Sequence, residues 1–570
     1  MLALLGVACG EGKQAEGGGA GGAGSGGRSA GAAGVMQGGN PGAGTAGGGQ
    51  AGAGAGGGGT SAGTTAGAAG AGAGAGGAGG SSGSATAGSA GALAGSGGAA
   101  GSTGGAGGGS GGGFGSETLA LSNLAIERNP NMTISCFVSW TTPEPATSEV
   151  QFGEGGYQFR IRDDELVTEH RVLVIGMHAE TNYQIKAFSG NARGTGTSDG
   201  TFMTGQLPNH VPATTLTKND TAKTQPGWIL TNIQASSFSA PATAVMLDQG
   251  GEVVWYYVHG TSGDMRGDVS TELFSDGVLV GPTNGEEPRL VDLSGAVTWE
   301  GPQQGTQQLM SHFAMRRPNG NFVLNWEIDK SAQNGSTRID DQRIEEITPE
   351  RQVVWSWTMF DHVEPSGTKE ELCHGNHVTF DDPGGVVYYN CRWVGVFKID
   401  RMSGEVLWRL GGTYDETSLG PGDFTFSPPD SKFSDAHEPE FLADGKLMLY
   451  DNGGYAGLGG PGGQDFHTRI LEYEIDETTM TATKTFEFPG DFPVDAWYKE
   501  DWYAPFWGDT DQLANGNILV TAGVRSASAS TRIFEITREG EVVWEITFPP
   551  NNGSYKAERL TPPPLVEAMP

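Results

Sequence analysis

The chain has 570 residues, a net charge of −33 and 98 glycines. A chain this acidic argues against nucleic acid or anionic lipid as a direct partner, because like charges repel. The length predicts more than one domain, and the composition changes sharply near residue 116, where a Gly-rich segment gives way to a mixed sequence.

The first segment, residues 1–9, reads MLALLGVAC and has small residues before Cys9. It resembles the end of a bacterial lipoprotein signal, in which Cys9 is lipidated after cleavage, although the basic start of such a signal is missing. The alternative is an ordinary apolar N-terminus. We expect an exported protein, either periplasmic or held as a lipoprotein on the outer membrane or cell surface. No other run reaches the ~18 apolar residues of a membrane-spanning helix.

Residues 10–116 are almost entirely Gly, Ala, Ser and Thr. Such a segment has too little apolar surface to offset the entropy lost on ordering, so we predict a disordered linker. A flexible coil of this length reaches roughly 50–60 Å, which follows from about 5–6 Å times the square root of the residue number. A collagen structure is excluded, because the segment has no Gly-X-Y period with proline.

Residues 117–206 contain short runs in which apolar and polar residues alternate, and this alternation predicts half-buried strands. The runs are MTISCFVSW (132–140), SEVQFG (148–153), HRVLVIGM (170–177) and NYQIKAFSG (182–190). Tyr183 resembles the tyrosine corner of fibronectin-type sandwiches. Cys136, in mid-strand, is expected to be buried. We therefore predict a small fibronectin-III-like β-sandwich.

An internal repeat begins near residue 213 and decides the predicted fold of residues 213–570. One repeated element is a strand that ends in an aromatic residue. Its six copies are GEVVW (251–255), GAVTW (295–299), RQVVW (351–355), GEVLW (404–408), the degenerate TATKTF (481–486) and GEVVW (540–544). We expect the Trp of each copy to pack between neighbouring units.

The second repeated element is a turn followed by an apolar run. Its copies are GWILTNI (227–233), SDGVLV (275–280), PNGNFVL (318–324), PGGVVYY (383–389), ADGKLML (443–449) and ANGNILV (514–520). NG and DG dipeptides tolerate the positive φ angles of tight turns between strands. Repeats that each hold several short strands are typical of propeller blades. We therefore predict an all-β chain in which a six-bladed β-propeller follows the linker and the β-sandwich.

Two histidines, His312 and His437, stand eight residues ahead of the turn glycines Gly320 and Gly445. In a propeller this position lies at the start of the innermost strand of a blade, and the innermost strands surround a central axis. The last blade has Gly508 at the same position. The repeat therefore predicts that imidazoles from two different blades face each other across the axis.

The blade between them contains the hairpin CHGNHVTFDDPGGVVYYNCRW (373–393). If its pairing is centred on Pro383, His374 lies directly across from Arg392, and both side chains point toward the axis. His377 competes with His374, because it also stands eight residues before a turn glycine. Strand alternation allows one of these two histidines to face the axis, and a bulge would be needed for both.

The same pairing puts Cys373 and Cys391 on the opposite face of the hairpin, diagonal to each other. A one-residue change of register would make them a direct pair. Exported proteins form disulfides, whereas cytosolic proteins keep their thiols reduced. The sequence leaves open whether these two cysteines are bonded or free.

Three histidines and an arginine suit the transfer of a tetrahedral anionic group. Arginine offers fixed donors to a phosphate or sulfate, and a neutral histidine serves as nucleophile or as acid and base near pH 7. No cofactor is expected, because the chain lacks a P-loop, a GxGxxG that follows a strand and opens a helix, and HExxH. Group transfer through a covalent histidine intermediate fits best. A metal site completed by Glu438, or a ring of polar groups around water, competes with it.

Several segments resemble the bacterial arylsulfate sulfotransferases. They are residues 373–412, with the run IDRMSGEVLWRLGG, then FSDAHEPEFLADGKLMLYDNG (433–453) and LANGNILVTAG (513–523). The resemblance covers about residues 213–570, and a small β-sandwich ahead of the propeller also suits the family. It implies a cofactor-free, ping-pong transfer of a sulfuryl group from an aryl sulfate to a phenol.

The resemblance also implies roles for single residues. His437 would be the nucleophile that becomes transiently sulfated. His312, His374 and Arg392 would bind the sulfuryl oxygens and help the phenolate to leave, and one of the two histidines would take the proton of the acceptor phenol. Asn376, in the H-x-N motif that begins at His374, would contact the substrate.

Two positions depart from the family pattern. Members often carry Asp after the first and the last of these histidines, where this chain has Phe313 and Glu438. Phe313 favours the alternative of a non-catalytic propeller for ligand binding or adhesion, and a metal-dependent hydrolase on the same propeller also stays open. The expected partners are small aryl sulfates and phenols, with a membrane reached only through a lipid on Cys9. No oligomeric state is predicted.

Overall fold

The computed structural model describes residues 114–235, 241–259, 271–282, 286–305, 308–329, 340–362, 373–392, 394–411, 424–454, 467–523 and 530–569. The signal-like segment and nearly all of the predicted linker lie outside these residues. The described chain is almost wholly β-structure, and its three short helical segments are η1 (Met359–Asp361), η2 (Pro429–Ser431) and η3 (Trp497–Asp501). None of the helices in this described part is long and apolar enough to cross a membrane.

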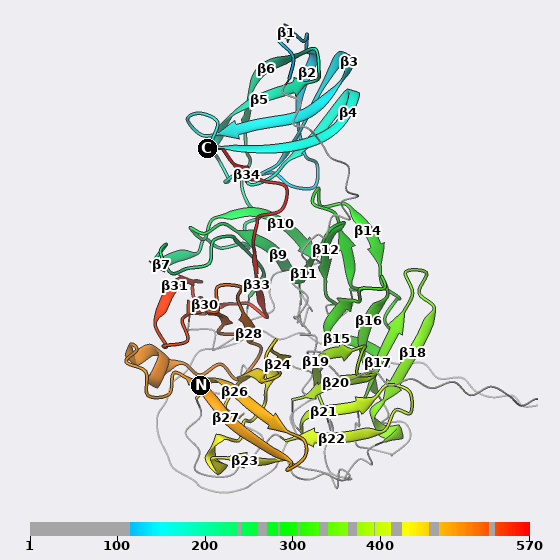
Figure 1. Cartoon of the computed structure of the whole chain (residues 1–570), viewed down its shortest axis with the longest axis vertical. Coiled ribbons are helices and arrows are strands. Elements are labelled where there is room, and N and C mark those ends of the chain that lie inside the picture. The colour runs from blue at the N-terminus through cyan, green and yellow to red at the C-terminus, as the bar shows by residue number, and fades with distance from the viewer. Residues whose placement is uncertain are drawn as a thin grey trace, which may run out of the picture. The chain divides into compact units, whose positions relative to one another are not determined.

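The segment 117–206 folds into a hydrogen-bonded sheet, drawn in blue and cyan in Figure 1. Its strands are β1 (Glu117–Thr118), β2 (Ser122–Arg128), β3 (Cys136–Gly153), β4 (Phe159–Val174), β5 (Asn182–Gly190), β6 (Gly194–Met203) and the C-terminal β34 (Glu567–Ala568). The first half of β3 pairs with β2 and the end of β4, and its second half pairs with the start of β4 and with β5. The strands are as expected, and their likeness to a fibronectin domain stays a prediction.

Alternate residues of β3 form the buried core of this sheet. Cys136, Val138 and Trp140 are at most 1% exposed. Cys136 is a free thiol, and burial raises its pKa to about 12. Tyr183 on β5 is also buried, and its hydroxyl accepts a hydrogen bond of 2.8 Å from the backbone N–H of His178. The period-two pattern of the sequence therefore identified the buried face correctly.

Six further sheets form the blades of a β-propeller, as predicted, and Figure 1 shows them around a common centre. The innermost strands of blades one to six are β33 (Ala557–Leu560), β11 (Thr271–Phe274), β15 (Gln308–Arg316), β19 (Gly375–Asp381), β24 (His437–Phe441) and β28 (Asp509–Gln512). The second strands are β8 (Trp228–Ala235), β12 (Gly277–Val280), β16 (Phe322–Asp329), β20 (Val386–Cys391), β25 (Leu447–Asp451) and β29 (Ile518–Thr521). These second strands carry the apolar runs of the repeat, directly after its turns.

The two outer strands complete each blade. The third strands are β9 (Ala242–Leu247), β13 (Arg289–Val291), β17 (Asp340–Ile347), β21 (Gly395–Asp400), β26 (Arg469–Asp476) and β30 (Arg532–Ile536). The fourth are β10 (Val253–His259), β14 (Val297–Glu300), β18 (Val353–Thr358), β22 (Val406–Leu410), β27 (Thr481–Phe488) and β31 (Val542–Thr547). Two short strands, β23 (Thr425–Ser427) and β32 (Asn552–Gly553), extend blades five and one. All six copies of the aromatic repeat element therefore lie on fourth strands.

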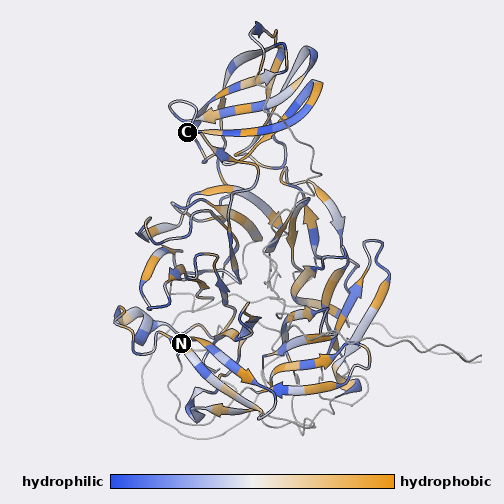
Figure 2. Ribbon diagram, in the orientation of Figure 1, coloured by the Kyte–Doolittle hydropathy of each residue, from blue (hydrophilic) through white to orange (hydrophobic). Residues whose placement is uncertain are grey.

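The second strand is the most consistently buried strand of the blades. Strands β12, β25 and β29 are buried along their whole length, whereas β14 and β18 reach solvent. In Figure 2 the apolar residues, drawn in orange, lie along the strands of the blades. Each blade therefore buries its second strand between its own neighbours and the adjoining blades.

Strands from both ends of the propeller segment close the ring. Blade one takes its innermost strand, β33, from the end of the segment, where it pairs with β8. Strand β7 (Thr215–Asn219), at the start of the segment, joins the outer edge of blade six beside β31. The last strand, β34, pairs with β4, so the final residues of the predicted range 213–570 pair outside the propeller. The repeats did not reveal this closure, because β33 carries neither repeated element.

Four of the repeated tryptophans join their blade to the next, as predicted. In four blades the indole N–H donates a hydrogen bond of 2.9 Å to a backbone carbonyl of the following blade. The pairs are Trp255 with Leu293, Trp299 with Pro349, Trp355 with Arg401, and Trp544 with Gln249. A tryptophan suits this place because it has a large apolar body and a single polar donor.

Ion pairs between a buried glutamate and a partly exposed arginine also join neighbouring blades, and the repeat did not reveal them. Glu346 on β17 accepts a bond of 2.6 Å from Arg401, in the turn before β22. Glu472 on β26 accepts a bond of 2.6 Å from Arg538, in the corresponding turn before β31. The repeat therefore also holds a charged contact between blades, far from the axis.

Candidate active site

The histidines predicted to face the axis lie on the inner strands of three neighbouring blades. His437 is the first residue of β24, His374 directly precedes β19, and His312 lies within β15. Each of these side chains is at most 2% exposed, and Arg392, which directly follows β20, is 1% exposed. The structure therefore buries all four predicted residues at the inner edge of the blades.

Four residues on or next to the inner strands have a left-handed backbone conformation, which residues other than glycine rarely adopt. The φ angle is +67° at His312, +54° at His374, +41° at Glu438 and +60° at Trp507. Such left-handed residues cost about 1–3 kcal/mol each and persist where the surrounding structure over-determines them, often at functional sites. Strain on four neighbouring blades at one level favours a functional site over an ordinary core.

A β-bulge brings His374 into this site. Near its turn, the hairpin of β19 and β20 is shifted by one residue from the predicted register. The bulge at Asn376 restores the predicted register at Gly375, which lies opposite Cys391. His374 then faces Arg392, whose backbone N–H donates to the His374 carbonyl at 3.1 Å. The predicted pairing of these two residues is therefore confirmed at the end of the hairpin.

His377 turns toward the neighbouring blade instead. Its Nδ1 lies 2.7 Å from Oε2 of Glu438, and Nζ of Lys556 lies 3.9 Å from the same oxygen. Although burial opposes ionisation of Glu438, the charges of His377 and Lys556 hold the pKa of Glu438 at about 2. Glu438 is therefore an ionised partner of His377, and His374 is the histidine of this blade that joins the other two.

The rings of His312 and His374 meet edge to face, with 4.5 Å between their centroids. Burial lowers the pKa of His312 well below its usual range, and its electrostatic interactions with His374, His437 and Arg392 lower it further. Because all three groups act on this one ring, the four side chains form one electrostatic unit. His312 is therefore neutral at pH 7, and one of its ring nitrogens carries a proton.

Arg392 brings a permanent positive charge into this buried unit. Its Nη2 donates to the carbonyl of Pro505 at 2.7 Å, and its Cζ lies 4.9 Å from the ring centroid of Phe506. These two contacts orient the planar guanidinium, whose fork of donors matches the oxygens of a sulfate or phosphate group. A buried cation beside the neutral rings of His312 and His437 favours an anionic ligand.

His437 is held in one tautomer by Asn452, which directly follows β25. The amide nitrogen of Asn452 donates to the carbonyls of Ala504 and Trp507, each at 2.7 Å. Its oxygen, Oδ1, must therefore face Nδ1 of His437, which lies 2.6 Å away. Since that oxygen only accepts, Nδ1 carries the proton and Nε2 carries a lone pair.

The electrostatic surroundings of His437 keep its ring neutral. Burial lowers its pKa to about 3, and the charge of Arg392 adds to this effect. Its Nε2 is buried and has no hydrogen-bond partner among the residues that the structure describes. The ring therefore presents an unprotonated, available nitrogen at pH 7, as a histidine nucleophile requires.

Replacing Asn452 by Ala is expected to lower kcat about 10- to 100-fold, the range seen when the partner that orients a functional histidine is lost. The rate of the step in which His437 attacks should fall, and KM should change less. The reason is that Asn452 orients the His437 ring and is not expected to contact the substrate. Steady-state and single-turnover kinetics on the variant measure this split.

Asn517→Ala is the matched control, because Asn517 is a buried amide whose Nδ2 donates to the Lys223 carbonyl and to Glu535, in blade six. It should lower the melting temperature without lowering kcat. An Asn452→Ala protein that folds and keeps its kcat would contradict the orienting role.

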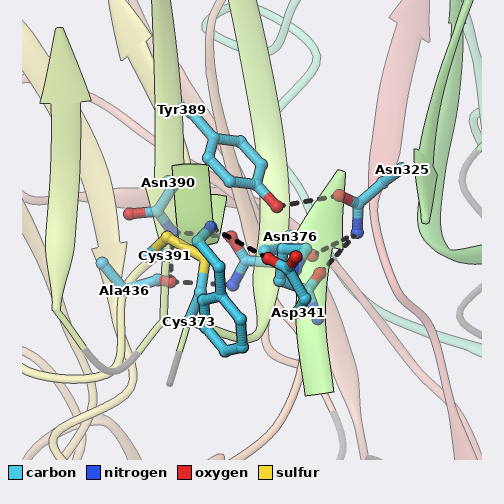
Figure 3. Close-up of a disulfide and its surroundings, with 11 residues drawn as sticks. Asn325, Asp341, Cys373, Asn376, Tyr389, Asn390, Cys391 and Ala436 are labelled. Atoms are coloured by element: carbon cyan, nitrogen blue, oxygen red, sulfur yellow. Dashed lines mark hydrogen bonds between the residues drawn. A yellow bond between two sulfur atoms is a disulfide. The ribbon is translucent and has the colours of Figure 1, made fainter. Parts of the chain in front are cut away.

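Asn376, predicted to contact the substrate, makes hydrogen bonds that support the backbone before His437 (Figure 3), and its contact with the substrate stays a prediction. Its Nδ2 donates to the carbonyl of Ala436 at 2.9 Å, and its Oδ1 accepts from Asn390 at 2.6 Å. Asn390 also donates to the Ala436 carbonyl, at 2.7 Å. Both amides therefore hold the backbone directly before His437. Asn376 is 0% exposed, in keeping with this role.

The contacts of Gly375 explain why a glycine separates His374 from Asn376. The Tyr389 hydroxyl donates to Asn325 at 2.8 Å, and Asn325 donates to the Gly375 carbonyl at 2.9 Å (Figure 3). A Cβ atom at Gly375 would lie 1.6 Å from the Tyr389 hydroxyl oxygen. Glycine is therefore needed here for the close approach of backbone and ring.

Tyr555 and Asn452 belong to the site and were missed by the sequence analysis. The ring of Tyr555 lies 6.3 Å from those of both His312 and His437, and its hydroxyl donates to the Asn376 carbonyl at 3.1 Å. Tyr555 precedes β33, so only the closure of the ring brings it to the axis. Asn452 offered a signal in the sequence, as a polar residue directly after an apolar strand, but the pair Asn452–Gly453 resembles an ordinary turn.

The competing metal site finds no support in the geometry. Among the described residues, no group of three or more His, Cys, Asp or Glu side chains is arranged to hold a metal ion. Glu438, the predicted fourth ligand, pairs with His377. Phe313, the other departure from the family pattern, is buried in the core between blades three and four.

The chain was compared with known families and structures. The family model described as Arylsulfotransferase (ASST) matches residues 213–556, which is more than half of the chain. No curated protein matches the chain in sequence.

Three solved structures resemble the chain distantly. BamB from Moraxella catarrhalis is 13% identical with a TM-score of 0.25, covering 66% of this chain and 93% of that chain. A quinonprotein alcohol dehydrogenase-like protein from Bacteroides thetaiotaomicron is 10% identical with a TM-score of 0.30, covering 78% and 96%. The Cps50 (Swd1) β-propeller domain from Myceliophteria thermophila is 13% identical with a TM-score of 0.31, covering 60% and 89%. Likenesses at this level carry no argument about the present chain.

Proposed function

The chain belongs to the arylsulfotransferase family, and from that premise we propose that it moves a sulfuryl group from an aryl sulfate to a phenol by way of a sulfated His437. The family membership supports sulfuryl transfer in general and small aryl sulfates and phenols as substrates. The covalent step at His437 is the finer part of the proposal. It is supported by the residues around that ring.

One observation carries the covalent step: Asn452 fixes the proton of His437 on Nδ1. Nε2 is then a nucleophile that needs no base to activate it. The pKa of about 3 keeps the ring in this form at any pH at which the protein is expected to work. Neither a metal nor a cofactor is required for the attack.

In the first step, Nε2 of His437 attacks the sulfur of the donor. The N–S bond forms as the bond between sulfur and the aryl oxygen breaks, and the bonding electrons leave with the phenolate. A phenol has a pKa of about 10, so its anion departs readily once the sulfuryl oxygens are stabilised. Arg392 and the N–H groups of His312 and His374 supply that stabilisation.

In the second step, the oxygen of the acceptor phenol attacks the same sulfur and the N–S bond breaks. The acceptor loses its proton to one of the other two imidazoles, either His374 or His312, and His437 returns to its starting form. The two steps use one site, so the first phenol must leave before the second one binds. The expected kinetics are therefore ping-pong.

We propose further that the protein acts outside the cytoplasm, either in the periplasm or as a lipoprotein anchored through Cys9. The disulfide between Cys373 and Cys391 supports export, because the cytosol keeps most thiols reduced. A tether of residues 10–116 would then place the folded part at a distance from the membrane.

Incubation with 4-nitrophenyl sulfate and phenol tests the function. We expect release of nitrophenol and formation of phenyl sulfate. Donor alone, quenched with base after mixing, should leave an adduct of ~80 Da on the peptide that contains His437, because a sulfated histidine is a covalent intermediate. Intact and peptide mass spectra measure it.

Nitrophenol release without any adduct would indicate direct transfer between donor and acceptor and would contradict the covalent mechanism. An adduct on another residue would move the nucleophile to that residue. A folded protein that releases no nitrophenol with any of several phenols would overturn the proposed transfer itself.

A further inference from the structure

Each cysteine of the disulfide directly precedes a residue of the site. Cys373 is followed by His374, and Cys391 is followed by Arg392. The two cysteines are bonded, with 4.6 Å between their Cα atoms, and both are 0% exposed. One covalent bond therefore joins the two backbone positions from which the imidazole and the guanidinium project.

The backbone ladder of the hairpin reaches its end beside these two positions. The ladder between β19 and β20 ends at the pair of Gly375 and Cys391, and the bulge interrupts it next to that pair. Beyond it, one backbone hydrogen bond of 3.1 Å joins Arg392 to His374. Antiparallel strands separate more easily where ladder bonds end, and the disulfide joins the two strands covalently at this point.

The conformation of His374 increases the need for such a link. Its φ of +54° is unfavourable for a residue with a side chain, and it persists only where neighbouring groups force it. The bond from Cys373 fixes the residue directly before it. If the bond were broken, the backbone at His374 could relax toward an ordinary strand conformation, and the ring would leave its place beside His312.

We infer that the Cys373–Cys391 disulfide is a positioning element of the active site and that its reduction slows sulfuryl transfer. The inference rests on the proposed function. The sulfuryl oxygens must be held by Arg392 and His374 together, and the disulfide sets the distance between the two. Misplacing a group by about 1 Å can cost 10²-fold in rate.

The redox step is a thiol–disulfide exchange with a dithiol reductant. The S–S bond breaks, the two sulfurs take up two electrons and two protons as thiols, and the dithiol is oxidised to its own disulfide. Because both cysteines are buried, the reductant reaches them only when the hairpin opens. Reduction is therefore expected to be slow in the resting protein.

The test compares the oxidised protein, the protein treated with dithiothreitol, and the double variant Cys373→Ala/Cys391→Ala. We expect kcat to fall about 10²-fold in the last two, in line with the misplacement of Arg392 and His374. Reoxidation should restore kcat in the treated wild type and should leave it low in the variant. Cys136→Ala, which removes the buried free thiol of the N-terminal sheet, is the matched control and should keep its activity.

Hydrogen exchange supplies a readout that needs no activity. The peptide that covers residues 373–381 should exchange faster in the reduced protein, while peptides of blade six stay unchanged. Equal kcat and equal exchange in oxidised and fully reduced protein, with the thiols counted by alkylation, would overturn the inference. Failure of the oxidised wild type to release nitrophenol would instead overturn the proposed function, and the exchange result would still report on the hairpin.

Discussion

Replacing His437 by Gly is expected to lower sulfuryl transfer by at least about 10³-fold, because the variant loses the atom that forms the covalent bond to sulfur. The structure gives the reason in two parts. Nε2 of this ring is the nitrogen with the lone pair, and the ring is neutral because burial and Arg392 lower its pKa to about 3. A measurement of nitrophenol release over hours separates this loss from the background rate.

Chemical rescue makes the His437 prediction specific. Glycine leaves a space the size of the ring, so added imidazole should restore part of the release from His437→Gly and should itself become sulfated. His259→Gly is a matched control, because His259 is also a buried imidazole, with its pKa lowered to about 3, on the fourth strand of blade one. Its activity should stay within a few-fold of wild type at a temperature where it is folded. Rapid release by His437→Gly without imidazole would falsify the assignment.

The pH profile follows from the same lowered pKa. A free imidazole has a pKa of about 6.5 and is mostly protonated at pH 5. His437 stays unprotonated at that pH, so the rate of adduct formation should change little between pH 7 and pH 5 while the protein is folded. A loss of adduct formation with a midpoint near 6.5 would show that the ring titrates as if it were exposed.

Burial of His437 should make the free energy of unfolding depend on pH in the opposite sense to a salt bridge that involves a histidine. The pKa of His437 in the folded protein is below its unfolded value. Between these two pKa values the unfolded chain binds a proton on this ring and the folded chain does not. The ring therefore has no effect on stability above pH 6.5 and destabilises the fold as pH falls from about 6.5 toward 3.

Replacing Arg392 by Lys is the second change with a large expected effect, a fall of about 10²- to 10³-fold in the rate of adduct formation, comparable to the loss of one oxyanion donor. The substitution keeps the positive charge and removes the fork. In the structure the fork is oriented by the Pro505 carbonyl and the Phe506 ring. An ammonium binds sulfate as a point charge and does not reproduce the paired donors.

The control for this prediction is Arg317→Lys. Arg317, directly after β15, is also buried, at 4% exposed, and its partners are Glu346 and Asp382 rather than residues of the site. That variant is expected to lose stability and to keep its rate of adduct formation. If Arg392→Lys forms the adduct as fast as the wild type, the paired geometry of the guanidinium is not needed for the reaction.

Much of the propeller could be predicted because its signals are local. A turn such as Asn319–Gly320, the apolar run after it and a strand ending in Trp355 each lie within a few residues of sequence. The chain adopts them wherever they occur. The count of six blades and the place of His312 and His437 on inner strands followed from the spacing of these signals. The tether and the lipid anchor were predicted from composition in the same way, and they remain predictions.

The ring closure, the bulge and the residues that support the histidines could not be predicted in this way. Strand β33 carries no repeated element, so nothing in the sequence placed Tyr555 beside His312. The bulge at Asn376 depends on packing against Ala436 in the next blade, and it decides that His374 rather than His377 joins the site. Asn452 acquires its role only when the carbonyls of Ala504 and Trp507 take both of its N–H groups.

The amino-acid sequence by itself determined the all-β class, the blade repeat and the set of histidines with their arginine, because these depend on periodicity and on side-chain chemistry. Tertiary structure alone decided the tautomer of His437, the partner of Glu438 and the bond between Cys373 and Cys391. Each of those outcomes depends on contacts between distant segments or on a register that differs by one residue. A one-residue shift moves a strand's side chains to the opposite face, and no local pattern specifies it here.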